Sequence, residues 1–278
     1  MNLDPRVTPL RDGIAAFSLQ GVEAAEVYLD TVDMTCAAPA AAIRAAAEAG
    51  AEQMDQILFG EPFRVLEEEG AFRFGQAGRD GYMGFVEAAA LAPDIRTPSH
   101  RVAALRTYAF AEPSIKSRAT ALYSINSLVR VEGQQGRLAK IAGSGWVTAD
   151  HLVPVGEFED DFVAVAERFV GTPYLWGGHE SLGLDCSGLV QQALFACGEA
   201  CPRDTDQQQA LGREIAAADF GRGDLVFWKG HVAIGAGDGR IVHANGHHMA
   251  TVIEPLAGAI ERIAGAGVGQ PTAYRRLI

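Results

Sequence analysis

The chain has 278 residues, 48% hydrophobic and 21% charged, which is typical of a globular protein of one to three domains. Its formal net charge of −12 argues against nucleic acid or an anionic membrane as a partner, because both require an excess of Lys and Arg. No apolar run approaches the ~18 residues of a membrane-spanning helix. Residues 1–6 lack the basic and apolar regions of a secretory signal, so we predict a cytoplasmic protein. The four cysteines, Cys36, Cys186, Cys197 and Cys201, do not indicate a secreted disulfide framework in a chain this long.

The first part of the chain reads as an extension followed by a small β-barrel. Residues 1–32 are predicted to be an N-terminal extension with one amphipathic segment at 22–29. Residues 37–51 are rich in alanine and favour a helix by propensity, but Pro39 and the β-like pattern after it argue against one. Short strands separated by glycines and charged turns are then expected at residues 62–65, 71–74 and 81–86. This spacing predicts a barrel over residues 33–95.

A second unit repeats this pattern over residues 96–156. Its strands are expected at residues 102–108, 128–131, 138–141 and 145–148. The sequence of residues 85–93 is echoed at 146–154, with the same spacing from an aromatic residue to a proline. The echo indicates a duplicated barrel. A linker then leads to a helix over residues 162–170, which Gly171 ends.

Cys186 lies at the predicted start of a helix. Apolar residues recur on one helical face at Leu189, Val190, Ala193, Leu194 and Cys197. Gly198 follows at the position of a C-terminal cap. A thiol in the first turn ionises more easily, because it sits at the positive end of the helix dipole. The alternative is a small buried cysteine that only packs.

Two histidines follow on predicted antiparallel strands. Strands are expected at residues 224–228, 231–235 and 240–245, joined by hairpin turns. His231 opens the second strand and His243 lies inside the third, so both imidazoles can share one face of the sheet. Cys186, His231 and His243 then form the order nucleophile, base and orienting group, with the Cys186 N–H as oxyanion donor. For His243 the alternative is a hydrogen-bonded core histidine.

Five motifs in this half carry a resemblance to a known family. They are Tyr174-x-Trp176-Gly177-Gly178, Asp185-Cys186-Ser187-Gly188, Gly223-Asp224-Leu225-Val226-Phe227, Gly230-His231-Val232-Ala233-Ile234 and Ile241-Val242-His243-Ala244. Residues 157–278 resemble the NlpC/P60 family of cysteine peptidases, whose core is papain-like. The two barrels resemble bacterial SH3-like modules. The resemblance implies an α+β fold: a papain-like catalytic domain preceded by two all-β SH3-like barrels.

The resemblance also implies a substrate pocket. The family branch with SH3-like modules, the dipeptidyl-peptidase VI type, cleaves γ-D-glutamyl–diamino acid bonds in muropeptides with a free N-terminal L-Ala. By resemblance, pocket residues on the catalytic domain are Asp185, Ser187, Asp204 and Thr205, with Tyr174 and Trp176 lining the cleft. Glu61 and Tyr82 of the first barrel would close its amine end.

Each of these residues also has a plainer interpretation. Asp185 can simply cap the helix that Cys186 begins. Glu61 can be a solvated surface acid, and Tyr174 and Trp176 can be packing aromatics.

The resemblance, together with the lack of a secretory signal in residues 1–6, implies a cytoplasmic peptidase that trims muropeptides during cell-wall recycling. Two alternatives are an amidase or acyltransferase on the same core, and a non-catalytic binder of peptidoglycan fragments. We expect no cofactor and no metal, because the spacing of His243, His247 and His248 is broken by a turn at Gly246. The patterns specify neither the diamino acid nor an oligomeric state.

Overall fold

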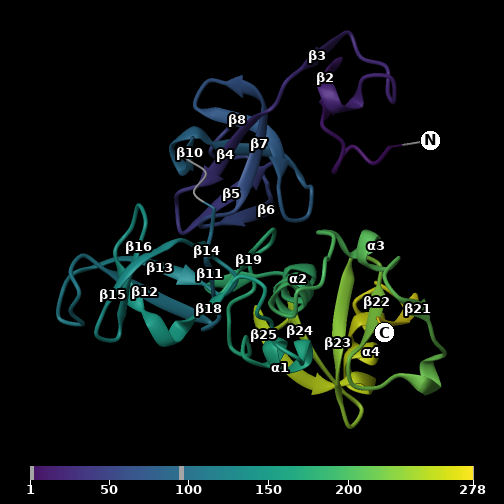
Figure 1. The fold of residues 1–278 in the computed structure, drawn as a ribbon. Helices are drawn as coiled ribbons and strands as arrows, with labels where there is room; N and C mark the ends of the chain where they lie inside the picture. Colours follow the sequence, from purple (N-terminus) through teal and green to yellow (C-terminus); the bar gives the residue numbers. More distant parts are fainter. Residues whose placement is uncertain (1–2, 94–96, 278) are drawn as a thin grey trace. The chain divides into compact units, whose positions relative to one another are not determined.

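The computed structural model describes residues 3–93 and 97–277, which form two compact units, Met1–Glu157 and Phe158–Ile278. Figure 1 shows their helices and strands, with labels where there is room. Within the described ranges, no helix is long and apolar enough to cross a membrane. Each unit is described by itself below.

The first unit begins with a small sheet. Strands β1 (Leu10–Arg11), β2 (Ile14–Ala16) and β3 (Val27–Leu29) form it, with the 3₁₀ turn η1 (Phe17–Leu19) between the last two. The predicted amphipathic segment 22–29 therefore ends in a strand, which pairs in parallel with β2.

A seven-stranded sheet follows, in the order β10-β4-β7-β8-β9-β5-β6. Its strands are β4 (Val32–Cys36), β5 (Ala40–Arg44), β6 (Gln53–Leu58), β7 (Pro62–Glu69), β8 (Phe72–Ala77), β9 (Met83–Glu87) and β10 (Leu91–Ala92). The alanine-rich segment 37–51 contains β5 and no helix, because Ile43 is fully buried in the core together with Ile57 and Phe63. Tertiary packing overrides the helix propensity of alanine here.

The second barrel repeats the first in local structure. Its strands are β11 (His100–Val102), β12 (Arg106–Phe110), β13 (Ala119–Ser124), β14 (Leu128–Val129), β15 (Val131–Gln135), β16 (Leu138–Ile141), β17 (Trp146–Thr148) and β18 (Leu152–Pro154). The predicted echo is confirmed: β9 leads through η2 (Ala88–Ala90) to β10, and β17 leads through η3 (Ala149–His151) to β18. Both copies form strand, 3₁₀ turn and strand.

The two barrels contact each other within this unit. The N–H of Leu128 donates to the carbonyl of Phe59 at 2.8 Å, and the rings of Phe59 and Tyr123 lie 4.6 Å apart. Gly60 has φ +81, and a Cβ there would meet the Leu128 carbonyl oxygen at 1.9 Å. Only glycine fits this close approach.

The second unit is built on a six-stranded antiparallel sheet. The order is β21-β26-β22-β23-β24-β25. These strands are β21 (Arg213–Glu214), β22 (Asp224–Trp228), β23 (His231–Gly237), β24 (Arg240–Asn245), β25 (Ala250–Pro255) and β26 (Ala273–Arg276). The remaining elements are α1 (Phe162–Glu167), β19 (His179–Glu180), β20 (Gly183–Leu184), α2 (Cys186–Ala196), α3 (Thr205–Gln208), η4 (Ala217–Asp219) and α4 (Leu256–Gly265).

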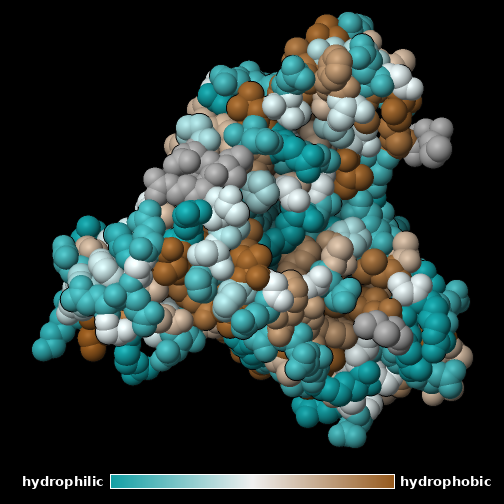
Figure 2. Space-filling view, in the orientation of Figure 1, coloured by the Kyte–Doolittle hydropathy of each residue, from teal (hydrophilic) through white to brown (hydrophobic). Residues whose placement is uncertain are grey.

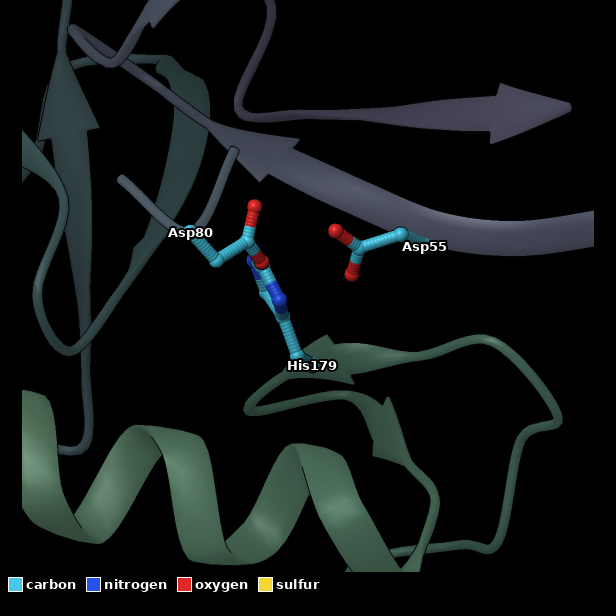
Figure 3. Close-up of side chains that lie close together, drawn as sticks. All are labelled: Asp55, Asp80 and His179. Atoms are coloured by element: carbon cyan, nitrogen blue, oxygen red, sulfur yellow. The ribbon is translucent and has the colours of Figure 1, made fainter. Parts of the chain in front are cut away.

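Helix α2 is the buried centre of this unit. It packs against α1 and against β23 and β24, and all of its residues are buried. The sequence predicts one apolar face, but the polar face is buried as well. Gln191 finds internal partners: its Nε2 donates to the Cys201 carbonyl at 3.3 Å, and its Oε1 lies 3.3 Å from Nδ1 of His179, which Figure 3 shows on β19. Burial of the Gln191 amide costs little because both of its polar atoms have partners.

Candidate active site

Cys186 is the first residue of α2, as predicted. Asp185 caps the helix, because its Oδ1 accepts a hydrogen bond from the Gly188 N–H at 2.8 Å. The Cys186 sulfur accepts hydrogen bonds from the backbone N–H groups of Val232 and Ser187. The start of α2 is thereby held against β23 at Val232, the residue that follows His231.

The cysteine is a thiol at rest. The pKa of Cys186 is raised to about 12, chiefly by burial and then by the charge of Asp185, while the two N–H groups and Arg203 oppose the shift. The helix start therefore does not by itself ionise the thiol, because desolvation outweighs the hydrogen bonds from the two N–H groups. A base must take the proton as the sulfur attacks.

His231 and His243 supply that base and its partner. His231 Nε2 lies 2.8 Å from His243 Nδ1, and the ring centres are 5.1 Å apart. Because His231 Nε2 faces His243, its Nδ1 is the nitrogen that can take the Cys186 proton. The prediction that both imidazoles share one face of the sheet is confirmed.

Both imidazoles are neutral at pH 7. The pKa of His231 is lowered to about 3, chiefly by burial and then by the neighbouring His243 and Arg262. Burial also lowers the pKa of His243 to about 4, although Glu254 opposes this shift. A neutral imidazole has a nitrogen that can accept a proton, which general-base catalysis requires.

A carboxylate lies behind His243. Glu254 Oε1 is 2.7 Å from His243 Nε2, and Arg262 of α4 pairs with the same carboxylate. The line Cys186, His231, His243, Glu254 thus runs from α2 across three strands of the sheet. A cavity of about 240 Å³ opens beside both imidazoles, and its lining includes Lys229, His247 and Arg262.

Asp185 also belongs to a buried ion pair. Arg203 donates to both of its oxygens, through Nη1 to Oδ1 at 3.0 Å and through Nη2 to Oδ2 at 2.6 Å. Oδ2 accepts a further bond from the Gly177 N–H at 3.0 Å, and Ser187 Oγ accepts one from Arg203 at 2.7 Å. The predicted pocket residues Asp185 and Ser187 are therefore brought together, held by an arginine to which the sequence interpretation gave no role.

Asp204 and Thr205 lie at the start of α3, next to this network. Gln207 Oε1 accepts a hydrogen bond from the Asp204 N–H at 3.2 Å. Gln208 ties α3 to α2 by donating to the Ser187 carbonyl at 3.0 Å. The two predicted residues thus lie at the start of the short helix that Gln208 joins to Ser187, and their binding roles stay predictions.

The two predicted cleft aromatics differ in exposure. Tyr174 is half-buried, and burial raises its pKa, with further contributions from the nearby Cys186 and Asp185. Trp176 is 56% exposed, so it is not a core packing residue. Both lie in the loop that leads to β19.

Glu61 and Tyr82 belong to the first unit. Glu61 is 1% exposed and not a solvated surface acid; its carboxylate pairs with Arg79 at 2.9 Å. Tyr82 is buried in the first barrel's core, and its N–H donates to Oδ1 of Asp80, which Figure 3 shows in the loop after β8. In the same unit, Asp55 lies on β6. The amine-binding roles of Glu61 and Tyr82 stay predictions.

Two family models match the chain. Residues 171–263 match the NlpC/P60 family, and this range contains Cys186, His231 and His243. Residues 43–91 match the bacterial dipeptidyl-peptidase Sh3 domain. The chain carries an NlpC/P60 cysteine peptidase domain.

Relatives of this NlpC/P60 chain match along most of its length. It is 29% identical over 212 residues to the gamma-D-glutamyl-L-lysine dipeptidyl-peptidase of Bacillus subtilis, which covers 68% of this chain and 71% of the relative. It is 28% identical over 222 residues to the dipeptidyl-peptidase 6 of Lysinibacillus sphaericus, covering 70% and 81% of the two chains. The crystal structure of an NlpC/P60 family protein from Bacillus cereus has a TM-score of 0.76 at 19% identity, over 88% of this chain and 99% of that one. The expected fold, an α+β catalytic domain after SH3-like barrels, is confirmed.

Sequence interpretation missed Arg203, Arg262 and Glu254 of the NlpC/P60 domain. Arg203 stands 18 positions from Asp185, and nothing in its local pattern indicates a buried partner. Glu254 lies two residues beyond Val252, which pairs with His243 across β24 and β25. A signal existed for Glu254, because residues two apart on a strand share a face, but it required the register of these strands.

Proposed function

We propose that this protein is a peptidoglycan peptidase that hydrolyses the γ-D-glutamyl–diamino acid bond of muropeptides with a free N-terminal L-Ala. The observation that carries the proposal is that the Cys186 sulfur accepts a hydrogen bond from the N–H of Val232, the residue after His231, whose Nε2 lies 2.8 Å from His243 Nδ1. Relatives named as dipeptidyl-peptidases support the choice of substrate, since such enzymes release two residues from a free amino end.

The chemistry follows from the order of these groups. Cys186 gives its proton to His231 Nδ1 as the sulfur attacks the γ-carbonyl carbon of D-Glu. The backbone N–H of Cys186, in the first turn of α2, is placed to donate to the developing oxyanion. The protonated His231 then gives its proton to the nitrogen of the diamino acid, which leaves, and an L-Ala-γ-D-Glu thioester remains on Cys186. Water, deprotonated by His231, hydrolyses the thioester and restores the thiol.

A free-amine requirement supports a role in recycling inside the cell. In intact wall material the peptide is attached through its N-terminal L-Ala to a sugar, so such an enzyme would spare the wall and accept only released peptides. The acidic net charge of −12 is compatible with a substrate that carries amines. Cell fractionation tests the location: activity confined to a secreted or envelope fraction would contradict cytoplasmic recycling.

The decisive experiment compares two peptides and three proteins. L-Ala-γ-D-Glu-diaminopimelate and its N-acetylated copy are incubated with the wild type, with Cys186→Ala and with Cys201→Ala, and products are identified by mass spectrometry. Cys201 is a matched control because it is also a buried cysteine. We expect release of L-Ala-γ-D-Glu from the free-amine peptide by the wild type and Cys201→Ala only.

The other outcomes separate the alternatives. Equal cleavage of the acetylated peptide would contradict the amine requirement and favour an amidase or acyltransferase. No cleavage of either peptide, with tight binding by Cys186→Ala and wild type alike, would contradict the peptidase and favour a binder. The same assay with L-Lys in the third position decides which diamino acid is preferred.

A further inference from the structure

A hydrogen-bonded line continues past the Cys-His-His set to an acid on the next strand. His243 Nδ1 lies 2.8 Å from His231 Nε2, and His243 Nε2 lies 2.7 Å from Glu254 Oε1. The register of β24 and β25 sets this contact, because His243 pairs with Val252 and Glu254 lies two residues further on the same face. Glu254 therefore contacts the orienting histidine on the side away from His231.

The carboxylate of Glu254 is ionised. Arg262 donates to both oxygens, through Nη2 to Oε1 at 2.5 Å and through Nη1 to Oε2 at 3.1 Å. Burial would raise the pKa of Glu254, but the hydrogen bonds from His243 and Arg262 outweigh it and hold this pKa below its usual range. Since an ionised carboxylate only accepts hydrogen bonds, His243 Nε2 must carry the hydrogen between them.

A second neighbour, Asn245, would favour the opposite tautomer of His243. Asn245 Nδ2 lies 3.1 Å from His243 Nε2, and it could donate if that nitrogen were bare. Asn245 Oδ1 is already held by the backbone N–H of His248 at 2.9 Å, which fixes the amide orientation. The charged contact at 2.7 Å is the stronger, because hydrogen bonds to ions are roughly twice as strong as neutral ones.

We propose that Glu254 is a positioning residue that keeps His243 in the Nε2–H tautomer, and through it presents His231 to Cys186 with a bare Nδ1. With the Nε2 hydrogen committed to Glu254, His243 Nδ1 can only accept, so His231 must donate from Nε2. The nitrogen of His231 that is left for the thiol is then a base. The inference rests on the roles given above to Cys186, His231 and His243.

The charge of Glu254 acts in the same direction as the tautomer. The groups that face His243 are Glu254, Arg262 and His248, and those that face His231 are His243, Arg262 and Asp185. Of these groups, only the acids Glu254 and Asp185 favour a protonated imidazole. Glu254 is the acid that contacts the histidine pair, through His243. Glu254 thereby lowers the free energy of proton transfer from Cys186 to His231.

The test measures how fast Cys186 reacts with iodoacetamide as a function of pH, in the full-length protein. Peptide mapping separates its adduct from those of Cys36, Cys197 and Cys201. The variants are Glu254→Gln, which keeps the shape and removes the charge, and Arg262→Met, which breaks the same ion pair and leaves the carboxylate on His243. This measurement needs no peptide substrate, so it stands even if the proposed substrate is wrong.

The two variants are expected to shift the pH profile in opposite directions. In Glu254→Gln the amide can donate to His243, so the tautomer and the charge are both lost. The midpoint of reactivity should rise by about one pH unit, which is about tenfold slower alkylation below it. In Arg262→Met the midpoint should stay or fall, because a positive charge beside the imidazoles is removed. Equal upward shifts would mean that the ion pair only holds α4, and would overturn the proposal.

A spectroscopic measurement on the wild type keeps the proposal testable if Glu254→Gln folds poorly. The ¹⁵N shifts of the His243 ring should show hydrogen on Nε2 and a bare Nδ1; hydrogen on Nδ1 would overturn the proposal. For peptide cleavage we expect kcat of Glu254→Gln to fall about tenfold or more with KM little changed, as for other residues that orient a functional histidine. Glu254→Asp, which keeps the charge on a shorter side chain, should recover part of the loss.

Discussion

Two acid–arginine pairs flank the reactive residues of the catalytic unit, and they are built differently. Asp185, beside Cys186, has both oxygens on Arg203 and further hydrogen bonds from Gly177 and Gly188. Glu254, behind His243, divides its carboxylate between Arg262 and the imidazole. The charge of Asp185 is therefore nearly fully compensated by its partners. Glu254 keeps one strong contact with His243, and through it with the line of reactive residues.

The difference follows from what each acid does to its neighbour. A negative charge beside a thiol opposes the thiolate, and the charge of Asp185 does raise the pKa of Cys186. Arg203 counters this effect while Asp185 serves as helix cap and anchor. A negative charge behind a histidine favours the imidazolium instead, so Glu254 is useful where it is left partly uncompensated. The effect of an acid near an active site therefore depends on the groups with which it is paired.

Arg203→Met should have the largest effect on stability. The side chains of Arg203 and Asp185 are 1% and 8% exposed, so the substitution leaves a buried, unpaired carboxylate. We expect a loss of about 3–5 kcal/mol in the free energy of unfolding, measured by urea denaturation at pH 7. A loss below ~1 kcal/mol would show that Asp185 does not depend on Arg203.

Acidification should destabilise the folded protein through the two buried histidines of the site. The folded-state pKa values of His231 and His243 lie near 3 and 4, below the unfolded value of about 6.5, so the stability they provide is present above pH 6.5 and is lost as pH falls toward 4. Between pH 7 and pH 5 we expect each histidine to lower the free energy of unfolding by up to about 2 kcal/mol. Urea denaturation at both pH values measures this loss. His243→Gln should reduce the slope of the free energy of unfolding against pH. An equal slope in that variant would contradict the neutral buried state of His243.

Arg262→Met should have the smallest effect. The side chains of Glu254 and Arg262 are 17% and 22% exposed, so water compensates part of the lost pair. We expect a loss of about 1 kcal/mol in the free energy of unfolding at pH 7. The comparison between the two pairs fails if Arg262→Met and Arg203→Met cost the same.

The sequence revealed the residues that local patterns specify. Cys186 was placed at a helix start by the apolar spacing after it, and the echo of residues 85–93 at 146–154 predicted two copies of one local structure. Hairpin turns placed His231 and His243 on adjacent strands. The helix start and the hairpins are predicted from nearby residues, and the echo from the comparison of two short segments, so none of these inferences needs a tertiary contact.

Residues whose roles depend on distant partners were beyond such patterns. Arg203 and Glu61 are both buried and ion-paired, but charge and polarity alone made a surface position the plainer expectation for Glu61. The ionisation of Cys186 depended on how deeply the helix start is buried, which helix periodicity does not give. Glu254 required the register of β24 and β25, and that register is set by the turn between them.

The central claim is that Cys186 carries the acyl group of the substrate, and trapping that intermediate tests it most directly. Wild-type protein is mixed with L-Ala-γ-D-Glu-diaminopimelate, quenched in acid during turnover and analysed by peptide mass mapping. The account predicts an L-alanyl-γ-D-glutamyl adduct on the peptide that contains Cys186 and none in Cys186→Ala. An adduct on another residue, or one that retains the diamino acid, would contradict it.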